Sequence, residues 1–259
     1  MTGYAPLDVP KPVADGLWII DGPPVACRGL PHPTRATVVR LEGGALWVHS
    51  PTRLTDGLAR SLEALGPVAY LVAPNRLHYT HLPEWQARYP QAQSWGAPGV
   101  ADRAAEQGVE LRIDAGLEAE AVPPWAGEID QLLVGGSARH REMVFFHRAS
   151  DTLILTDIIQ SFETAHVPAW MRPLIWLSGA DDSDGRMPSL LRWSYRDKTA
   201  LAASVDAMIG WEPARIVLSH GRWYERDAVG ELERAFRREL RHRRWDRLLG
   251  DARRDGEDA

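Results

Sequence analysis

Short apolar runs broken by turn residues dominate the first fifty positions of the chain. One run covers residues 17–20 and ends at the Asp-Gly-Pro-Pro cluster of residues 21–24. Two more runs, residues 37–41 and 45–48, are separated by the Glu-Gly-Gly turn at residues 42–44. Two apolar runs joined by a short glycine-containing turn are typical of a β-hairpin. The chain is therefore predicted to open with antiparallel strands.

A strand–helix alternation follows the hairpin. Leucines at positions 54, 58, 62 and 65 recur at helical spacing, and Gly66-Pro67 ends that helix. Residues 68–72 form a continuous apolar run, as expected of a strand that is buried on both faces. The same reasoning predicts helices over residues 84–89 and 100–107 and strands over residues 94–95 and 109–113.

The second half of the chain repeats this order, with strands first and an alternation of helix and strand after them. Runs at residues 129–134, 143–147, 152–156 and 215–218 are predicted strands. Helices are predicted over residues 200–209 and, rich in arginine, over residues 228–249. No linker or low-complexity segment separates the halves. We therefore expect a single α/β domain, residues 1–259, with sheets inside and helices outside.

Composition narrows the chemistry that the chain can perform. Among 259 residues there are nine histidines and 35 acidic residues but one cysteine, Cys27. That excludes a disulfide framework and cysteine-rich zinc sites, so any metal site must use imidazole and carboxylate ligands. The net charge of −5 does not predict a nucleic-acid-binding surface. The chain lacks an apolar stretch of about 18 residues and a signal-peptide pattern at its start, so we expect a cytoplasmic protein without a membrane partner.

Candidate metal ligands follow three of the predicted strands. His78 and His81 follow the strand at residues 68–72, Asp157 follows the strand at 152–156, and His220 follows the strand at 215–218. In α/β proteins, ligands bind beyond the carboxyl ends of strands. Histidine and aspartate are suitable ligands for zinc, iron or manganese. The sequence therefore predicts a site for one divalent metal built from these residues.

This order of motifs resembles the metallo-β-lactamase superfamily, over residues 17–223. In that superfamily one strand ends in His-x-His-x-Asp-His, a later strand ends in an aspartate that bridges two metals, and the last ends in a histidine before glycine. Asp157 and the Ser219-His220-Gly221 sequence match the later two positions. The resemblance implies a four-layer αββα sandwich and a metal-dependent hydrolase.

A narrower resemblance is to an uncharacterised bacterial branch of that superfamily, which is described as a domain of unknown function. It is carried by residues 71–78, Trp85, Tyr89-Pro90 and residues 145–157. Carried over residue by residue, this resemblance directs attention to His49, His78, Asp157 and His220. It implies a fold and no reaction.

The first metal motif departs from the superfamily pattern. When His78 and His81 are aligned with its second and last histidines, Arg76 and Thr80 replace the first histidine and the aspartate. His140 is only an approximate counterpart of the middle histidine. We therefore predict one metal, bound by His81, Asp157 and His220 together with His78, and not a metal pair.

Three functional hypotheses follow from this ligand set. The first is a hydrolase of a small-molecule substrate, with Arg76 and His78 as the candidate catalytic residues and Arg76 favouring an anionic substrate. The second is a non-catalytic relative that has lost the metal and binds a small anion or a protein. The third is a mononuclear iron oxygenase, because two histidines and one carboxylate are also its ligands.

Overall fold

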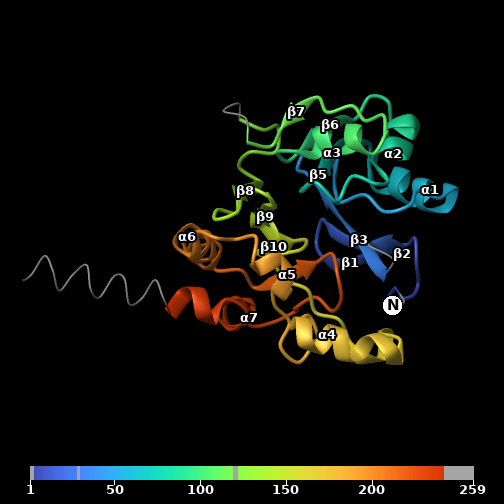
Figure 1. Cartoon of the computed structure of the whole chain (residues 1–259). Coiled ribbons are helices and arrows are strands. Elements are labelled where there is room, and N and C mark those ends of the chain that lie inside the picture. The colour runs from blue at the N-terminus through green and yellow to red at the C-terminus, as the bar shows by residue number, and fades with distance from the viewer. Residues whose placement is uncertain (1–2, 28–29, 119–121, 242–259) are drawn as a thin grey trace, which may run out of the picture.

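The computed structural model describes residues 3–27, 30–118 and 122–241, and its strands form two sheets (Figure 1). The first sheet has seven strands in the order β1-β2-β3-β4-β5-β6-β7, and the second has four in the order β11-β10-β9-β8. The strands of the first sheet are β1 (Pro10–Ala14), β2 (Leu17–Cys27), β3 (Leu30–Arg40), β4 (Leu46–His49), β5 (Val68–Ala73), β6 (Gln93–Gly96) and β7 (Ala115–Gly116). Those of the second are β8 (Ile129–Leu133), β9 (Met143–His147), β10 (Thr152–Leu155) and β11 (Arg215–Leu218).

Seven α-helices surround the sheets over the described ranges. They are α1 (Asp56–Leu65), α2 (Leu82–Arg88), α3 (Val100–Glu106), α4 (Arg172–Ser178), α5 (Ser189–Arg192), α6 (Lys198–Gly210) and α7 (Ala228–Ala235). In Figure 1, α1, α2 and α3 lie beside the first sheet, while α6 and α7 lie on the far side of the second sheet. Three single-turn 3₁₀ helices, η1 (Arg148–Ser150), η2 (Thr164–His166) and η3 (Ala169–Met171), complete the elements.

Alternation along the strands of the second sheet explains why the molecule has four layers. In β10, Ile154 packs in the core cluster of the first sheet, whereas Leu153 and Leu155 pack in a second cluster with α6 and α7. Successive side chains of a strand point to opposite faces, so a strand that is apolar at every position is buried on both. The order is therefore helices, sheet, sheet, helices, which confirms the predicted αββα sandwich.

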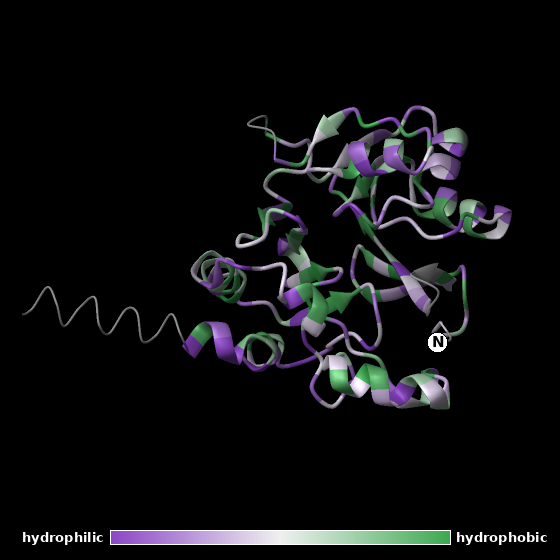
Figure 2. Ribbon diagram, viewed as in Figure 1, coloured by the Kyte–Doolittle hydropathy of each residue, from purple (hydrophilic) through white to green (hydrophobic). Residues whose placement is uncertain are grey.

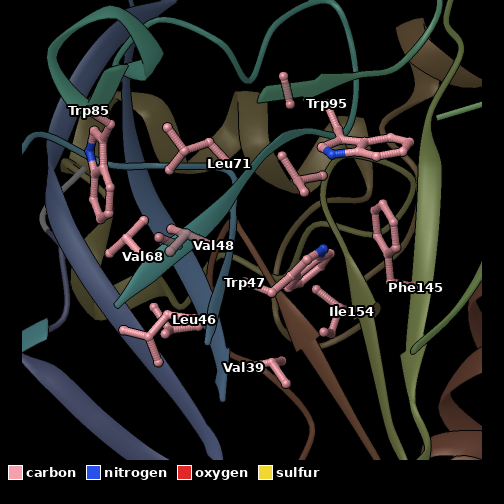
Figure 3. Close-up of a cluster of buried hydrophobic side chains, with 14 of the residues drawn as sticks. Val39, Leu46, Trp47, Val48, Val68, Leu71, Trp85, Trp95, Phe145 and Ile154 are labelled. Atoms are coloured by element: carbon pink, nitrogen blue, oxygen red, sulfur yellow. The ribbon is translucent and has the colours of Figure 1, made fainter. Parts of the chain in front are cut away.

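Large aromatic side chains fill the core on both faces of the first sheet (Figure 3). Trp47 of β4 is fully buried and lies edge-on to Phe145 of β9, with 5.0 Å between the ring centroids. Trp85 and Trp125 are fully buried as well. Because burial of one large apolar side chain contributes about 1.5–3 kcal/mol, these rings are a major part of the core.

The opening hairpin and the pairing of β4, β5 and β6 match the predicted order. β3 pairs with β4 in antiparallel orientation, and β5 is parallel to both β4 and β6. In the second sheet, β10 is antiparallel to β9 and parallel to β11. Leu155 pairs with Leu218, so the chain leaves these two strands at the same edge of the sheet.

Several predicted boundaries were wrong. The cluster at residues 21–24 is not a turn but part of β2, whose register shifts between Gly22 and Val25 around two prolines that cannot donate to a strand ladder. Residues 109–113 are not a strand, because the Gln86 side chain forms hydrogen bonds with both the backbone N–H and the carbonyl oxygen of Arg112.

The helix predicted over residues 228–249 begins as expected but is interrupted. Helix α7 ends at Ala235, a turn at Phe236 follows, and residues 237–241 are helical again. The remainder of that predicted helix, residues 242–249, lies outside the described residues. No helix in the described part of the chain is long and apolar enough to cross a bilayer.

Candidate metal centre

Two of the candidate ligands occupy equivalent positions beyond two paired strands. Asp157 is the second residue after the end of β10, and His220 is the second residue after the end of β11. These strands are parallel and in register, so both side chains emerge at one sheet edge. His78 reaches the same place from the turn that follows β5 in the first sheet.

The three side chains converge on one point. The Nε2 atoms of His78 and His220 are 3.2 Å apart. His78 Nε2 is 3.3 Å from Asp157 Oδ2, and His220 Nε2 is 3.3 Å from Asp157 Oδ1. Asp157 and His220 are buried, and the His78 side chain is 10% exposed, so one side of the group can be reached from solvent.

Hydrogen bonds to the outer ring nitrogens orient both imidazoles. His220 Nδ1 lies 2.8 Å from the carbonyl oxygen of Pro33. A carbonyl oxygen only accepts, so Nδ1 carries the proton and a neutral His220 presents the Nε2 lone pair to the group. His78 Nδ1 is 2.7 Å from Ser50 Oγ, which supports the same orientation. Outer hydrogen bonds of this kind are typical of metal-binding histidines.

The Asp157 carboxylate is held from two further sides. Asn75 Nδ2 donates to Oδ2 at 2.8 Å, and Gln160 Nε2 donates to Oδ1 at 3.1 Å. Burial alone would raise the pKa of Asp157, but its electrostatic interactions with His78 and His220 outweigh the effect of burial. The pKa therefore lies well below its ordinary value, and the group is an anion in the folded protein.

A second carboxylate, Glu142, lies directly behind the group and is fully buried. It accepts hydrogen bonds from the backbone N–H groups of Thr156 (2.8 Å) and Asp157 (2.9 Å). His140 Nε2 lies 3.2 Å from its Oε2. Burial lowers the pKa of His140, but the hydrogen bond to Glu142 and the charges of Asp157 and Glu142 raise it above the ordinary value. His140, Glu142 and Asp157 could also surround a cation, although Glu142 already serves these backbone donors.

An arginine of the first sheet braces the loop that carries His220. Arg35 Nη1 donates to the carbonyl oxygens of Leu218 (2.6 Å) and Gly221 (2.8 Å). Its Nη2 lies 2.8 Å from Asp21 Oδ1, and both side chains are 2% exposed. The loop therefore depends on a buried ion pair between β2 and β3.

His49 is close to the group but turned into the core. Its ring stacks on Trp47 with 5.6 Å between centroids, and among the described residues neither ring nitrogen has a hydrogen-bond partner. Complete burial, and to a smaller extent the charge of His78, lowers its pKa well below the ordinary value. His49 is therefore neutral, and it is Ser50, the next residue, that contacts His78.

The structure does not bring His81 into the group. Its Nδ1 lies 3.0 Å from Glu84 Oε1, within the first turn of α2, and it belongs to neither group of possible metal ligands in the described residues. Arg76 lies near the start of the same turn, with Nη2 3.6 Å from Glu106 Oε2 on α3. The positive charge of Arg76 also acts on His140. It lowers the pKa of His140, against the larger upward effect of Glu142 and Asp157.

Residue types and spacing of the group fit a divalent transition metal. Two histidines and one carboxylate suit zinc, iron or manganese. Ligand atoms bound tetrahedrally at about 2.0–2.1 Å lie about 3.3–3.4 Å from one another. The separations between His78, His220 and Asp157 are 3.2–3.3 Å. The group is thus arranged as one face of such a coordination shell, with the exposed edge of His78 beside it.

Comparison with protein families identifies the chain. A model described as "Domain of unknown function (DUF4336)" matches residues 15–189, which is more than half of the chain and includes His78 and Asp157. The chain belongs to the DUF4336 family. No curated protein matches the sequence.

Solved structures place this DUF4336 protein within the metallo-β-lactamase fold. It is similar to a metallo-β-lactamase from Pontibacter korlensis, with 12% identity, a TM-score of 0.60, and coverage of 88% of this chain and 98% of the other. It is also similar to a metallo-β-lactamase from Hirschia baltica, with 12% identity, a TM-score of 0.59, and coverage of 91% of this chain and 98% of the other. A third similar structure is a metallo-β-lactamase from Pseudomonas aeruginosa in the mono-zinc form, with 13% identity, a TM-score of 0.59, and coverage of 93% of this chain and 97% of the other. At such identities the likeness establishes the fold.

Several residues of the site carried no signal in the sequence. Ser50, Glu142 and Gln160 are polar residues without a recognisable motif around them, and each was missed. Asn75 stands directly after the predicted strand and could have been included on that ground. Arg35 lies 183 positions before Leu218, and no local pattern connects the two.

Proposed function

We propose that this DUF4336 protein is a hydrolase that uses one divalent metal, bound by His78, Asp157 and His220. The observation that supports it is the pair of Nε2 atoms 3.2 Å apart, each 3.3 Å from an oxygen of an ionised aspartate. When bound, a divalent metal supplies a nucleophile by lowering the pKa of a coordinated water towards ~7. The likeness to a mono-zinc metallo-β-lactamase agrees with a single-metal site.

The surrounding residues would orient the ligands and the substrate. Ser50 and Pro33 set the orientation of the two histidines, and Asn75 and Gln160 set that of the carboxylate. Arg76, 33% exposed, is the cation of the turn that also carries His78, and it would attract a small anionic substrate. Thr80, which stands where the superfamily motif has aspartate, is exposed and contributes no general base.

Metal analysis tests this proposal directly. The full chain is purified without an affinity tag or chelator, supplemented with zinc, iron or manganese, desalted, and analysed for each element. We expect about one equivalent of one metal and a rise in Tm that a chelator reverses. Asp157→Ala and His220→Ala should lose the metal. His81→Ala is the matched control and should retain it, because His81 lies outside the group.

Activity is then measured with chromogenic probes and an oxygen electrode. A chromogenic β-lactam, a thioester and bis-p-nitrophenyl phosphate cover three hydrolytic classes. Turnover that disappears in Asp157→Ala supports a hydrolase. Iron retained in preference to zinc, with oxygen consumption, would instead indicate the oxygenase that the same two-histidine, one-carboxylate set allows.

A metal-free anion-binding protein is the second candidate, and one observation favours it. Both oxygens of Asp157 already accept hydrogen bonds from amide groups, and a proton on His78 Nε2 could be shared with Asp157 and with the lone pair of His220. The three groups can thus satisfy one another without an ion. Less than about a tenth of an equivalent of every metal after supplementation would refute the metal proposal and favour this one.

A further inference from the structure

Large apolar side chains are exposed in one part of the molecule. Six of them lie between residues 170 and 193 and are 53–76% exposed: Trp170, Leu174, Trp176, Leu177, Leu190 and Trp193. We call this set the α4–α5 face. α4 lies at the margin of the molecule, outside the two packed sheets (Figure 1). In Figure 2 the ribbon of α4 carries green, apolar segments among pale and purple ones.

The two short helices bring several of these side chains together. Trp170, Leu174 and Leu177 are four and three positions apart, which places them in one row along η3 and α4. Ser189 Oγ donates to the carbonyl oxygen of Ser178 at 3.1 Å, so the start of α5 lies against the end of α4. Leu190 and Trp193, three positions apart, lie on one side of α5 and the residue that follows it.

The exposed area matches one half of a stable protein interface. With about 150–250 Å² available per large side chain, the six exposures amount to on the order of 800 Å². The largest apolar patch of an ordinary monomer is about 300–600 Å², whereas a standard interface buries about 800 Å² on each partner. Tryptophan is also enriched among the residues that contribute most to binding.

Charge around the face favours an apolar partner over a charged one. Residues 167–180 contain one charged side chain, Arg172, and no acid. Arg186 and Arg192, the other cations of this segment up to Trp193, are ion-paired with Asp184 at 2.6 Å and Glu239 at 2.5 Å. The face is therefore close to neutral and complements a copy of itself. A two-fold dimer pairs the same patch of both subunits.

We propose that the α4–α5 face is the interface of a homodimer. A recess of about 380 Å³ beside it offers space for a large side chain of the second copy. Its lining includes the apolar residues Phe162, Val167, Ile175 and Trp176 and the charged residues Arg172 and Asp181. The inference is independent of the metal, because none of the six face residues contributes to the His78, Asp157 and His220 group.

Sedimentation velocity and light scattering on the full chain test the proposal. We expect a mass twice that of the chain between about 1 and 100 µM, the range in which interfaces of this size associate. Leu177→Arg and Trp193→Arg should each weaken association at least about 100-fold, since each puts a charge into the interface. Both positions are more than two-thirds exposed, so the variants should fold. Circular dichroism and metal content verify this.

Val122→Arg is the matched control, because Val122 is 79% exposed and lies outside the face. It should leave the dimer intact. A wild-type monomer at the highest concentration overturns the proposal, as does a dimer that both face variants leave unchanged. A monomer that cosediments with vesicles of phosphatidylcholine and phosphatidylglycerol, and is released by Leu177→Arg, also overturns it, because the face would then bind a membrane.

Discussion

Replacement of Arg35 by methionine tests whether the buried ion pair holds the His220 loop. Arg35 and Asp21 are both 2% exposed, and Arg35 Nε and Nη2 lie 2.9 and 2.8 Å from Asp21 Oδ1. Methionine keeps most of the aliphatic volume but removes the charge and every donor. Breaking a buried pair from one side costs about 3–5 kcal/mol. Lys11 Nζ, 2.5 Å from Asp21 Oδ2, would still compensate part of the negative charge of Asp21 in this variant.

Two further groups lose their donor in this variant. The carbonyl oxygens of Leu218 and Gly221 would be left without the arginine, at about 1 kcal/mol each. Since Lys11 offsets part of the loss at Asp21, we expect a total decrease in the free energy of unfolding of about 3–5 kcal/mol. Urea denaturation of metal-free protein followed by circular dichroism measures it.

The control is an ion pair of the same kind at the surface. Arg53 Nη2 lies 2.7 Å from Asp8 Oδ2, but the Arg53 side chain is 52% exposed. Arg53→Met should therefore cost less than about 1 kcal/mol. Arg35→Lys, which keeps the charge but loses the fork geometry, should fall between the two. A loss below about 1 kcal/mol in Arg35→Met would refute the reasoning.

Two other substitutions follow from the backbone and from burial. Gly221→Ala should lower the free energy of unfolding by at least about 1–3 kcal/mol, because Gly221 has a φ of +91° and a Cβ there would overlap the Ser161 carbonyl. Gly43→Ala is the control, because the space around Gly43 is open. Equal urea midpoints of the two variants would contradict the argument. Burial lowers the pKa of His147 and, further, that of His49, so the unfolded chain binds more protons at both groups and stability should fall as pH drops below about 6.5 in metal-free protein. His147→Gln should make that part of the pH profile less steep while His49 keeps part of the slope, and an unchanged slope would exclude a contribution from His147.

Strand periodicity made the α/β class and two of the candidate ligands predictable, whereas the four-layer sandwich was implied by the resemblance to the metallo-β-lactamase superfamily. The runs before Asp157 and His220 each contain three consecutive apolar residues, 153–155 and 216–218, which indicates strands buried on both faces. Once two such strands are parallel and adjacent, the residues just beyond them must lie at one edge. Adjacency and register depend on long-range contacts, which the apolar pattern of each strand does not contain, and only the structure shows that these two strands pair in parallel.

The choice between His78 and His81 could not be made in the same way. Both lie in an irregular turn, where side-chain direction follows no period. In the structure the helix α2 begins after His81, and Glu84 in its first turn takes the His81 Nδ1 atom. His78 instead contacts Ser50, which lies 28 positions earlier and directly follows the neighbouring strand β4. Contacts between distant segments thus decide which histidine enters the group.

The proposed site lies where the two sheets meet, and residues of both sheets hold its ligands in place. His220 belongs to the second sheet, but Pro33 and Arg35 of the first sheet hold its ring and its loop. Asp157, also of the second sheet, is held by Asn75 of the first. Packing of the two sheets therefore assembles the group before any ion arrives. We expect metal to add binding energy to an already folded chain, as mass action requires, and not to be a condition for folding as in small zinc domains.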